Sequence, residues 1–348
     1  MRIRGLGKLR TVTQQLRNRF TPGGLILFYH RVSEVSSDPF KLCVKPRHFA
    51  EQMEVLRKYA QPMPLQQLVQ TVRDGKCPNR AVAVTFDDGY ADNLYEAKPL
   101  LERYDIPATV FVTTGNLGSQ REFWWDELGR LLLQPGKLPK TLRLSINGYN
   151  HEWDLSEAAD YSEDDYQRDR TWHYFLPRDE DPSPRQRIYR SLCQMLQPLL
   201  PDDRQQLMSE ILAWSGAEAT GRPTHYSLST AEVRTLEQGG LIEVGAHTVK
   251  HPFLSALPPA MQSQEIQQSK SRLEELLGHP VNNFAYPHGD FTETTVTLVR
   301  EAGFVSACST IAKKVGRNAN CFQLPRVGVA DWDGERFSRQ LSHWIGIE

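Results

Sequence analysis

The sequence of 348 residues contains few cysteines, no long apolar run and almost no net charge. Its five cysteines are scattered and form no C-x-x-C pair, which excludes a disulfide framework or a zinc–thiolate site and favours free thiols in a reducing compartment. No apolar run approaches the roughly 20 residues of a membrane span. A formal net charge of −1 gives no overall field that would select nucleic acid. The function must therefore be sought in local motifs.

The first 20 residues are basic and contain no acidic side chain. Their charges come from Arg2, Arg4, Lys8, Arg10, Arg17 and Arg19, without the apolar segment of a secretory signal. We expect a solvated lead-in over 1–23, with peripheral contact to an anionic membrane as the alternative. The missing export signal predicts a cytoplasmic protein, membrane-associated if that contact exists. The sequence does not predict an oligomeric state.

Strand-like and helix-like segments alternate along most of the chain, a pattern typical of parallel β/α units. Strands are predicted at 24–30, 81–86, 108–113, 241–246, 283–287, 304–309 and 323–329. Helices are predicted at 47–59, 65–72, 94–101, 229–238, 258–277, 292–302 and 338–345. Seven strands of this kind predict an α/β fold, a distorted (β/α)7-type barrel.

The alternation breaks between 119 and 224, where the composition changes. Five of the seven tryptophans lie there, at Trp124, Trp125, Trp153, Trp172 and Trp214. Asn147-Gly148 predicts a hairpin over 142–155. The stretch 154–181 is acidic and irregular, and two helices are predicted at 186–199 and 203–214. We predict an α+β insertion of about 106 residues in a barrel formed by 24–118 and 225–348, which is close to the ~250 residues of such barrels.

Ionisable residues follow several predicted strands, and the carboxyl ends of parallel strands meet at one rim of a barrel. They are His30, Asp87, Asp88, His247 and His288. Gly89 allows a sharp turn, so the two aspartates need not point to opposite faces. Like charges this close repel unless a cation holds one of them. Two imidazoles, His247 and His251, with one carboxylate would suit Zn²⁺ or a similar ion. A surface Asp-Asp-Gly turn and ordinary surface histidines are the alternative.

Three motifs in the chain resemble those of the polysaccharide deacetylases, carbohydrate esterase family 4. Thr85-Phe86-Asp87-Asp88-Gly89 matches the first motif, and His247-Thr248-Val249-Lys250-His251-Pro252 matches the second. Phe284-Ala285-Tyr286-Pro287-His288-Gly289 resembles the third more weakly. The resemblance covers about 24–118 and 225–330 and leaves the insertion outside. It implies a hydrolase that removes an N-acetyl group from an amino sugar in a glycan or a lipid-linked glycan precursor.

The resemblance also implies the roles of the matched residues. Asp88, His247 and His251 would hold a divalent metal, Zn²⁺ first, with Co²⁺, Ni²⁺ or Fe²⁺ as alternatives. Asp87 would be the general base that takes a proton from a metal-activated water.

Three further positions, in or beside the matched motifs, would face the substrate. The backbone N–H of His288 would help to bind the oxyanion. Tyr90 and Tyr286 are predicted to bind the substrate. These roles complete the site that the resemblance implies around the strand ends.

Three features depart from the family pattern, and one of them is His288, which stands where the third motif has a tyrosine before its glycine. Ala285 stands where the third motif usually carries an arginine that orients the catalytic aspartate, and no late Leu-x-His motif supplies an acid histidine. Because the first and last strands of a closed barrel are neighbours, a permuted chain could deliver that histidine from the other end. We therefore predict His30 as the general acid and Arg326 as the replacement guanidinium beside Asp87. The alternatives are a structural His30 and a surface ion pair of Arg326.

Two alternatives remain open from the sequence. Trp124 and Trp125 would either stack on sugar rings or anchor the insertion on the barrel. The function also has three possible interpretations. The protein would be the deacetylase, a different amide or ester hydrolase on the same metal site, or an inactive barrel that binds glycan or acts as a scaffold.

Overall fold

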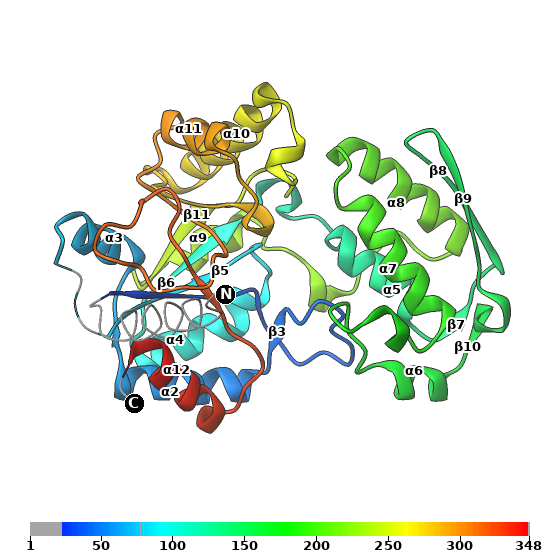
Figure 1. Ribbon diagram of the computed structural model, residues 1–348, viewed down its shortest axis with the longest axis horizontal. Coiled ribbons are helices and arrows are strands. Elements are labelled where there is room, and N and C mark those ends of the chain that lie inside the picture. The colour runs from blue at the N-terminus through cyan, green and yellow to red at the C-terminus, as the bar shows by residue number, and fades with distance from the viewer. Residues whose placement is uncertain (1–22, 77, 79, 347–348) are drawn as a thin grey trace, which may run out of the picture.

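The structure is a computed structural model, and it describes residues 23–346 except 77 and 79 (Figure 1). The basic lead-in therefore lies outside the described residues, apart from Gly23. Its expected contact with a membrane stays a prediction. Among the described residues, no helix combines the length and the apolar character that crossing a membrane requires.

Seven parallel strands form the centre of the larger lobe. In chain order they are β1 (Leu25–Tyr29), β5 (Ala81–Phe86), β6 (Ala108–Val112), β11 (Ile242–Ala246), β12 (Asn283–Ala285), β13 (Ser306–Cys308) and β14 (Val327–Gly328). Neighbours in the chain are neighbours in the sheet, and β14 pairs with β1. A short strand, β4 (Gln61–Pro62), also pairs with β5. All six residues of β5 are buried, as expected of a strand covered on both faces.

The sheet closes through the segment just before β14. Leu324 pairs in parallel with Cys308 at the end of β13, and Val327 pairs with Leu27 in β1. Residues 324–328 therefore join the two edges of the sheet, although both pairings are short. The predicted seven-stranded α/β barrel is confirmed, and the brief pairings of β13 and β14 are its distortion.

Helices surround this barrel (Figure 1). They are α2 (Pro46–Tyr59), α3 (Leu65–Arg73), α4 (Lys98–Tyr104), α9 (Thr230–Glu237), α10 (Pro259–Leu277), α11 (Glu293–Glu301) and α12 (Gly334–Ile345). A π-helical turn, Asn93–Ala97, leads into α4. The predicted helix at 338–345 begins four residues earlier, because the Asp333 side chain caps it by accepting from the Arg336 N–H at 2.8 Å.

A second lobe lies beside the barrel in Figure 1 and comes from the chain between β6 and α9. Its elements are α5 (Trp124–Leu133), β7 (Gly136–Lys137), β8 (Thr141–Ile146), β9 (Tyr149–Asp154), β10 (Asp160–Tyr161), α6 (Glu163–Asp169), α7 (Pro184–Leu196) and α8 (Pro201–Ser215). A core of its own includes Leu128, Leu142, Leu192 and Ile211. We call this segment the second lobe below.

The second lobe contains both confirmed and wrong predictions. The hairpin of β8 and β9 turns at Asn147 and Gly148, whose φ angles are 53° and 80°. The two predicted helices are α7 and α8. The prediction of an irregular stretch is wrong at α6, where Ser162 and Asp165 form a capping box that begins a helix despite the acidic sequence.

One arginine ties the second lobe together. Arg185 in α7 is 1% exposed, and its guanidinium donates to five backbone carbonyls. The acceptors, at 2.6 to 3.2 Å, belong to Leu132, Gln134, Gly136, Ala158 and Ala159. These bonds join α7 to the end of α5 and to the short β7–β10 ladder, where the carbonyls would otherwise lack partners.

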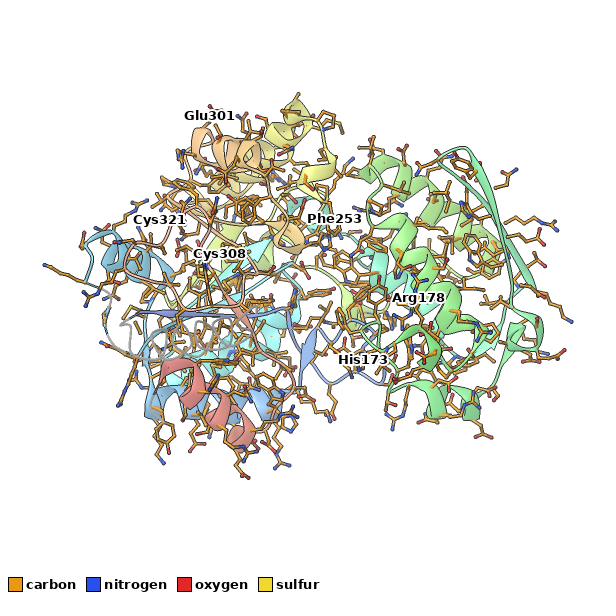
Figure 2. All side chains as sticks on the ribbon, in the orientation of Figure 1. His173, Arg178, Phe253, Glu301, Cys308 and Cys321 are labelled. Atoms are coloured by element: carbon orange, nitrogen blue, oxygen red, sulfur yellow. The ribbon has the colours of Figure 1, made fainter. Side chains whose placement is uncertain are left out.

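The four described cysteines are free, as predicted. Two of them, Cys308 and Cys321, lie in the barrel lobe (Figure 2), and Cys193 is buried in the core of the second lobe. No disulfide therefore supports either lobe within the described residues.

Candidate metal and catalytic site

The site begins at the turn that ends β5. Asp88 has a φ of 74° and Gly89 a φ of 80°, so two consecutive left-handed residues reverse the chain after Asp87. A Cβ on Gly89 would lie 3.2–3.3 Å from Val112, which leaves little room for a larger residue. The turn lets the two neighbouring carboxylates reach different partners. It thus permits Asp87 and Asp88 to have different functions.

Asp88 faces two histidines from the strand end of β11. Its Oδ1 lies 3.5 Å from Nε2 of His247 and 3.3 Å from Nε2 of His251, and the two Nε2 atoms are 3.2 Å apart. Thr248 and His251 both have positive φ, 65° and 53°, and this turns the loop back so that both rings reach one point. All three side chains are buried. Three donor atoms therefore converge at the rim of the barrel.

Hydrogen bonding and burial prepare these donors for a cation. His247 Nδ1 lies 2.8 Å from the Ala285 carbonyl oxygen, which can only accept, so Nδ1 carries the proton and Nε2 presents a lone pair. Burial, followed by the neighbouring imidazoles of His288 and His247, lowers the pKa of His251 well below its usual value. Two neutral imidazoles and one carboxylate fit a divalent cation such as Zn²⁺. Ala285 thus acts here through its backbone.

Asp87 is held by a different partner. Arg326 donates from both terminal nitrogens to the two oxygens of Asp87, at 2.7 and 2.8 Å, in a bidentate pair. The same guanidinium donates to Thr85 Oγ1 at 3.1 Å and to the Ser309 carbonyl at 3.0 Å. Burial alone would raise the pKa of Asp87, but the charge and hydrogen bonds of Arg326, together with His247 and His30, outweigh burial and the pKa is lowered. Asp87 is therefore ionised at neutral pH.

The predicted contact between Arg326 and Asp87 is present in the structure. Arg326 is fully buried and belongs to the segment that closes the barrel beside β1. The alternative of a surface ion pair is thereby wrong. The catalytic role of the pair stays a prediction.

His30 follows β1 and is half-buried at the same rim. Its ring packs edge-on against Phe28, with centroids 5.7 Å apart. A positive charge on His30 lowers the pKa of Asp87 and of His251, so its imidazole acts electrostatically on both parts of the site. Asn93 fixes the backbone here by donating to the His30 carbonyl at 2.9 Å. The role of His30 as the general acid stays a prediction.

His288 contributes more than the backbone N–H that the motif suggested. Its φ is 59°, and its ring stacks on Phe253 with centroids 4.0 Å apart and packs on His251 at 4.5 Å. Burial lowers the pKa of His288 to about 3, so the ring is neutral. The ring packs on the candidate metal cluster, the three donors Asp88, His247 and His251, while the oxyanion role of its N–H stays a prediction. The glycine that follows His288 could have indicated this tightly packed turn from the sequence, because a Cβ on Gly289 would lie 1.9 Å from Thr310 Oγ1.

The expected substrate contacts of two tyrosine side chains need correction. Tyr90 is fully buried, and its hydroxyl donates to Asp126 at 2.6 Å while accepting from Trp125 Nε1 at 2.9 Å. Tyr286 is also fully buried and donates to the Phe322 carbonyl at 2.8 Å. Both hydroxyls are already bonded inside the protein, so these side chains support the site and do not reach a substrate.

The second lobe reaches the site through α5. Trp125 is buried, stacks on Phe123 with centroids 4.7 Å apart, and lies 5.1 Å from the His251 ring centroid. Its bond to Tyr90 links α5 to the turn after β5. For Trp125 the structure favours the anchor over sugar stacking, and its contact with His251 was not predicted.

A family model for polysaccharide deacetylases matches residues 74–172 and 209–307, and the chain belongs to that family. The match extends into 119–172 and 209–224, beyond the ranges 24–118 and 225–330 that the motifs predicted. A poly-β-1,6-N-acetyl-D-glucosamine N-deacetylase of Staphylococcus aureus is 34% identical over 110 residues, 28% of this chain and 38% of that protein. The Bacillus subtilis protein YxkH is 28% identical over 139 residues, 39% and 48% of the two chains. The match thus spans less than half of either relative.

Solved structures of low sequence identity share the fold. The Streptococcus pyogenes deacetylase PplD, in complex with acetate, superposes with a TM-score of 0.57 at 16% identity, over 92% of this chain and 99% of that one. IcaB from Ammonifex degensii gives 0.57 at 19% identity, over 93% and 97%. Both matches cover most of the chain, so they support one fold for the barrel and the second lobe.

Proposed function

We propose that this protein is a metal-dependent N-deacetylase that removes the acetyl group from an amino sugar in a glycan. The observation that carries the proposal is the division of two adjacent carboxylates, Asp87 to a buried arginine and Asp88 to two imidazoles. Membership of the polysaccharide deacetylase family supports it, as does the activity in the name of the Staphylococcus aureus relative. The same site would accept a soluble or a lipid-linked glycan.

Asp88, His247 and His251 would hold the divalent cation. Zn²⁺ suits two neutral imidazoles and a carboxylate best, and Co²⁺, Ni²⁺ or Fe²⁺ would bind the same donors. When bound, the cation would make a water more acidic and polarise the amide carbonyl. The Ala285 carbonyl keeps His247 in the tautomer that binding requires.

The remaining residues would move the protons of the hydrolysis. Asp87 is ionised and would accept a proton from the attacking water, while Arg326 keeps its oxygens in a fixed orientation. The His288 N–H would donate to the carbonyl oxygen as that oxygen gains negative charge. His30 would donate a proton to the departing nitrogen, because an amine leaves poorly as an anion. Water and the amide would thus give acetate and a free amine.

The test is acetate release from N-acetylglucosamine oligosaccharides of β-1,6 and β-1,4 linkage, with Zn²⁺ or Co²⁺. We expect Asp87→Asn to lower kcat by about 10³-fold, since a positioned base contributes 10²–10⁴-fold. Metal binding by that variant should persist, whereas His247→Ala should lose it. Equal activity of the wild type and Asp87→Asn would contradict the proposal. So would a wild type that binds metal but releases no amine from these substrates.

A further inference from the structure

A cavity of about 230 Å³ adjoins the metal cluster and is lined by both lobes. His251 forms part of its wall, and Lys250 and the loop of Thr113–Asn116 complete the barrel side. Helices α5 and α8 form the other side. In Figure 2, Phe253, which stacks on the site residue His288, lies on the side of the barrel nearer the second lobe. The proposed hydrolysis uses no group of the second lobe in this cavity.

Arg204 from α8 lines the cavity with a donor that has no partner. Its side chain is buried, at 4% exposure, and one terminal nitrogen donates to the Lys250 carbonyl at 3.0 Å. The other terminal nitrogen, NH1, is buried and makes no hydrogen bond to the described residues. Glu265 acts on Arg204 electrostatically, but its carboxylate accepts from the backbone N–H groups of Val249 and Lys250. The guanidinium thus lacks a hydrogen-bonded carboxylate.

Trp124 adds a second free donor to the same wall. Its Nε1 is buried without a partner among the described residues, and the Arg204 guanidinium lies 5.4 Å from the centroid of its ring. The three acids of the lining are already bonded, since Glu122 holds Arg222 at 2.9 Å, Glu127 holds Arg121 at 2.7 Å and Asp202 holds Lys250 at 2.5 Å. Arg204 and Trp124 therefore present two buried donors without partners among the described residues, one of them charged.

Comparison with Arg185 shows that burial alone does not explain why Arg204 has a donor without a partner. Burial lowers the pKa of both guanidinium groups to about 10, so both are charged at neutral pH. Arg185 satisfies its donors with five carbonyls, whereas Arg204 makes one such bond and leaves NH1 without a partner. Leaving a buried charged donor without an acceptor is costly, and an anionic acceptor would offset that cost.

We propose that this cavity is a subsite for an anionic substituent, a carboxylate or a phosphate, on the glycan near the sugar that is deacetylated. Arg204 and Trp124 are its donors, and the shared wall of His251 connects it to the metal cluster. The cavity is smaller than the 300–1,000 Å³ of typical ligand pockets, so it holds a substituent or a single sugar. The proposal rests on the proposed function for the position of the glycan.

The experiment compares the binding of charged and neutral disaccharides by calorimetry. The carboxylate probe is glucuronic acid linked to N-acetylglucosamine, the phosphate probe is a 6-phosphorylated N,N′-diacetylchitobiose, and the neutral probe is N,N′-diacetylchitobiose. Zinc-loaded protein with Asp87→Asn is used so that the ligand is not consumed. Metal-free wild type repeats the series if that variant does not fold.

We expect at least one anionic probe to bind about tenfold tighter than the neutral one, and the two probes tell carboxylate from phosphate. Arg204→Gln should remove this preference and leave the affinity for the neutral probe within about twofold. Arg204→Lys should keep part of it, since the charge stays and the planar fork is lost. Arg143→Gln is the matched control, because Arg143 is an exposed arginine of the second lobe paired with Glu152.

Two results would overturn the subsite: equal affinity of the wild type for all probes, or a preference that persists in Arg204→Gln. Binding to the cation itself would give the second result, since it does not depend on Arg204. The binding preference requires no turnover. A protein that shows it without releasing acetate would contradict the proposed function and support the subsite.

Discussion

The barrel and the second lobe each bury an arginine, and the two are used differently. In the barrel, Arg326 directs both terminal nitrogens at the carboxylate of Asp87. In the second lobe, Arg185 directs its donors at carbonyls of the chain that packs around it. Both guanidinium groups are about 1% exposed or less. The first holds a charged side chain in one orientation at a rim, and the second holds backbone segments together.

The two lobes thus use a buried arginine for different purposes, one at the candidate site and the other to hold the backbone together. The barrel brings ionisable side chains from distant strands to one rim, where they are oriented by hydrogen bonds. The second lobe is a continuous segment with its own apolar core, and its buried charges mostly bond within it. It contacts His251 through Trp125, and its Arg204 lines the cavity that His251 also lines. Substitutions in the two lobes should therefore have separable effects.

Among the substitutions that compare the two lobes, the largest expected effect belongs to His30 in the barrel. His30→Gln should lower kcat for an N-acetylated sugar by about 10²–10³-fold, because the departing amine would lose its proton donor. Acetate release in a steady-state assay measures this.

The control for His30 is a substrate that needs no acid. Hydrolysis of 4-nitrophenyl acetate should fall by less than about tenfold, since nitrophenolate leaves without a proton. Equal losses on both substrates would contradict the acid role and place His30 among the structural residues.

Arg326→Met should destabilise the barrel by about 3–5 kcal/mol, because it leaves Asp87 buried without its partner charge. Urea unfolding measures the free energy of unfolding. The double variant with Asp87→Leu should recover most of the loss, since neither charge remains. A single variant as stable as the wild type would show that this pair is not what compensates the buried carboxylate.

Arg185→Met should cost about 2–4 kcal/mol and act within the second lobe, because several buried carbonyls lose their donor. Hydrogen exchange should increase at β7 and β10 while β5 keeps its protection. Arg143→Met, on the exposed hairpin, should change stability by less than about 0.5 kcal/mol. Equal loss of protection in β5 would show that the two lobes unfold as one unit.

The smallest effect concerns Asp126, which joins the lobes by accepting from Tyr90. Burial raises the pKa of Asp126 to about 7, against about 3.9 in an unfolded chain. Its contribution to stability is therefore full below pH 4 and is lost as the pH rises through 7. Asp126→Asn imitates the protonated form, so its Tm should gain a few degrees on the wild type between pH 4.5 and 7.5. A pH-independent difference would contradict the raised pKa.

Local patterns predicted much of the fold. Strand β5 matches its predicted range because an apolar run ended in charges, and α9 begins where Ser229 and Glu232 form the predicted capping box. The closing strand was predicted at 323–329, but β14 has two residues. Residues 324–328 pair partly with β13 and partly with β1. The local sequence does not indicate which of these residues pairs with which strand.

For the site, the sequence predicted the three donors that converge, Asp88, His247 and His251, and the contact between Arg326 and Asp87. It failed where partners are far apart in the chain. Tyr90 looks like a substrate contact beside the first motif, but Asp126 and Trp125, from the next lobe, bond its hydroxyl. The unpartnered state of Arg204 likewise depends on how α8 packs against the barrel, and no local pattern encodes that.

The pairing of Asp87 with Arg326 has a consequence during synthesis of the chain. The two residues are 239 positions apart, so at about 5–20 residues per second Arg326 follows Asp87 by roughly 10–50 s. Until then the strand that ends in Asp87 cannot be buried without an uncompensated charge, and the barrel stays open. The second lobe needs no later segment for its core and can fold in that interval. We expect the second lobe to be the first compact structure of the nascent chain, formed before the last strand closes the barrel.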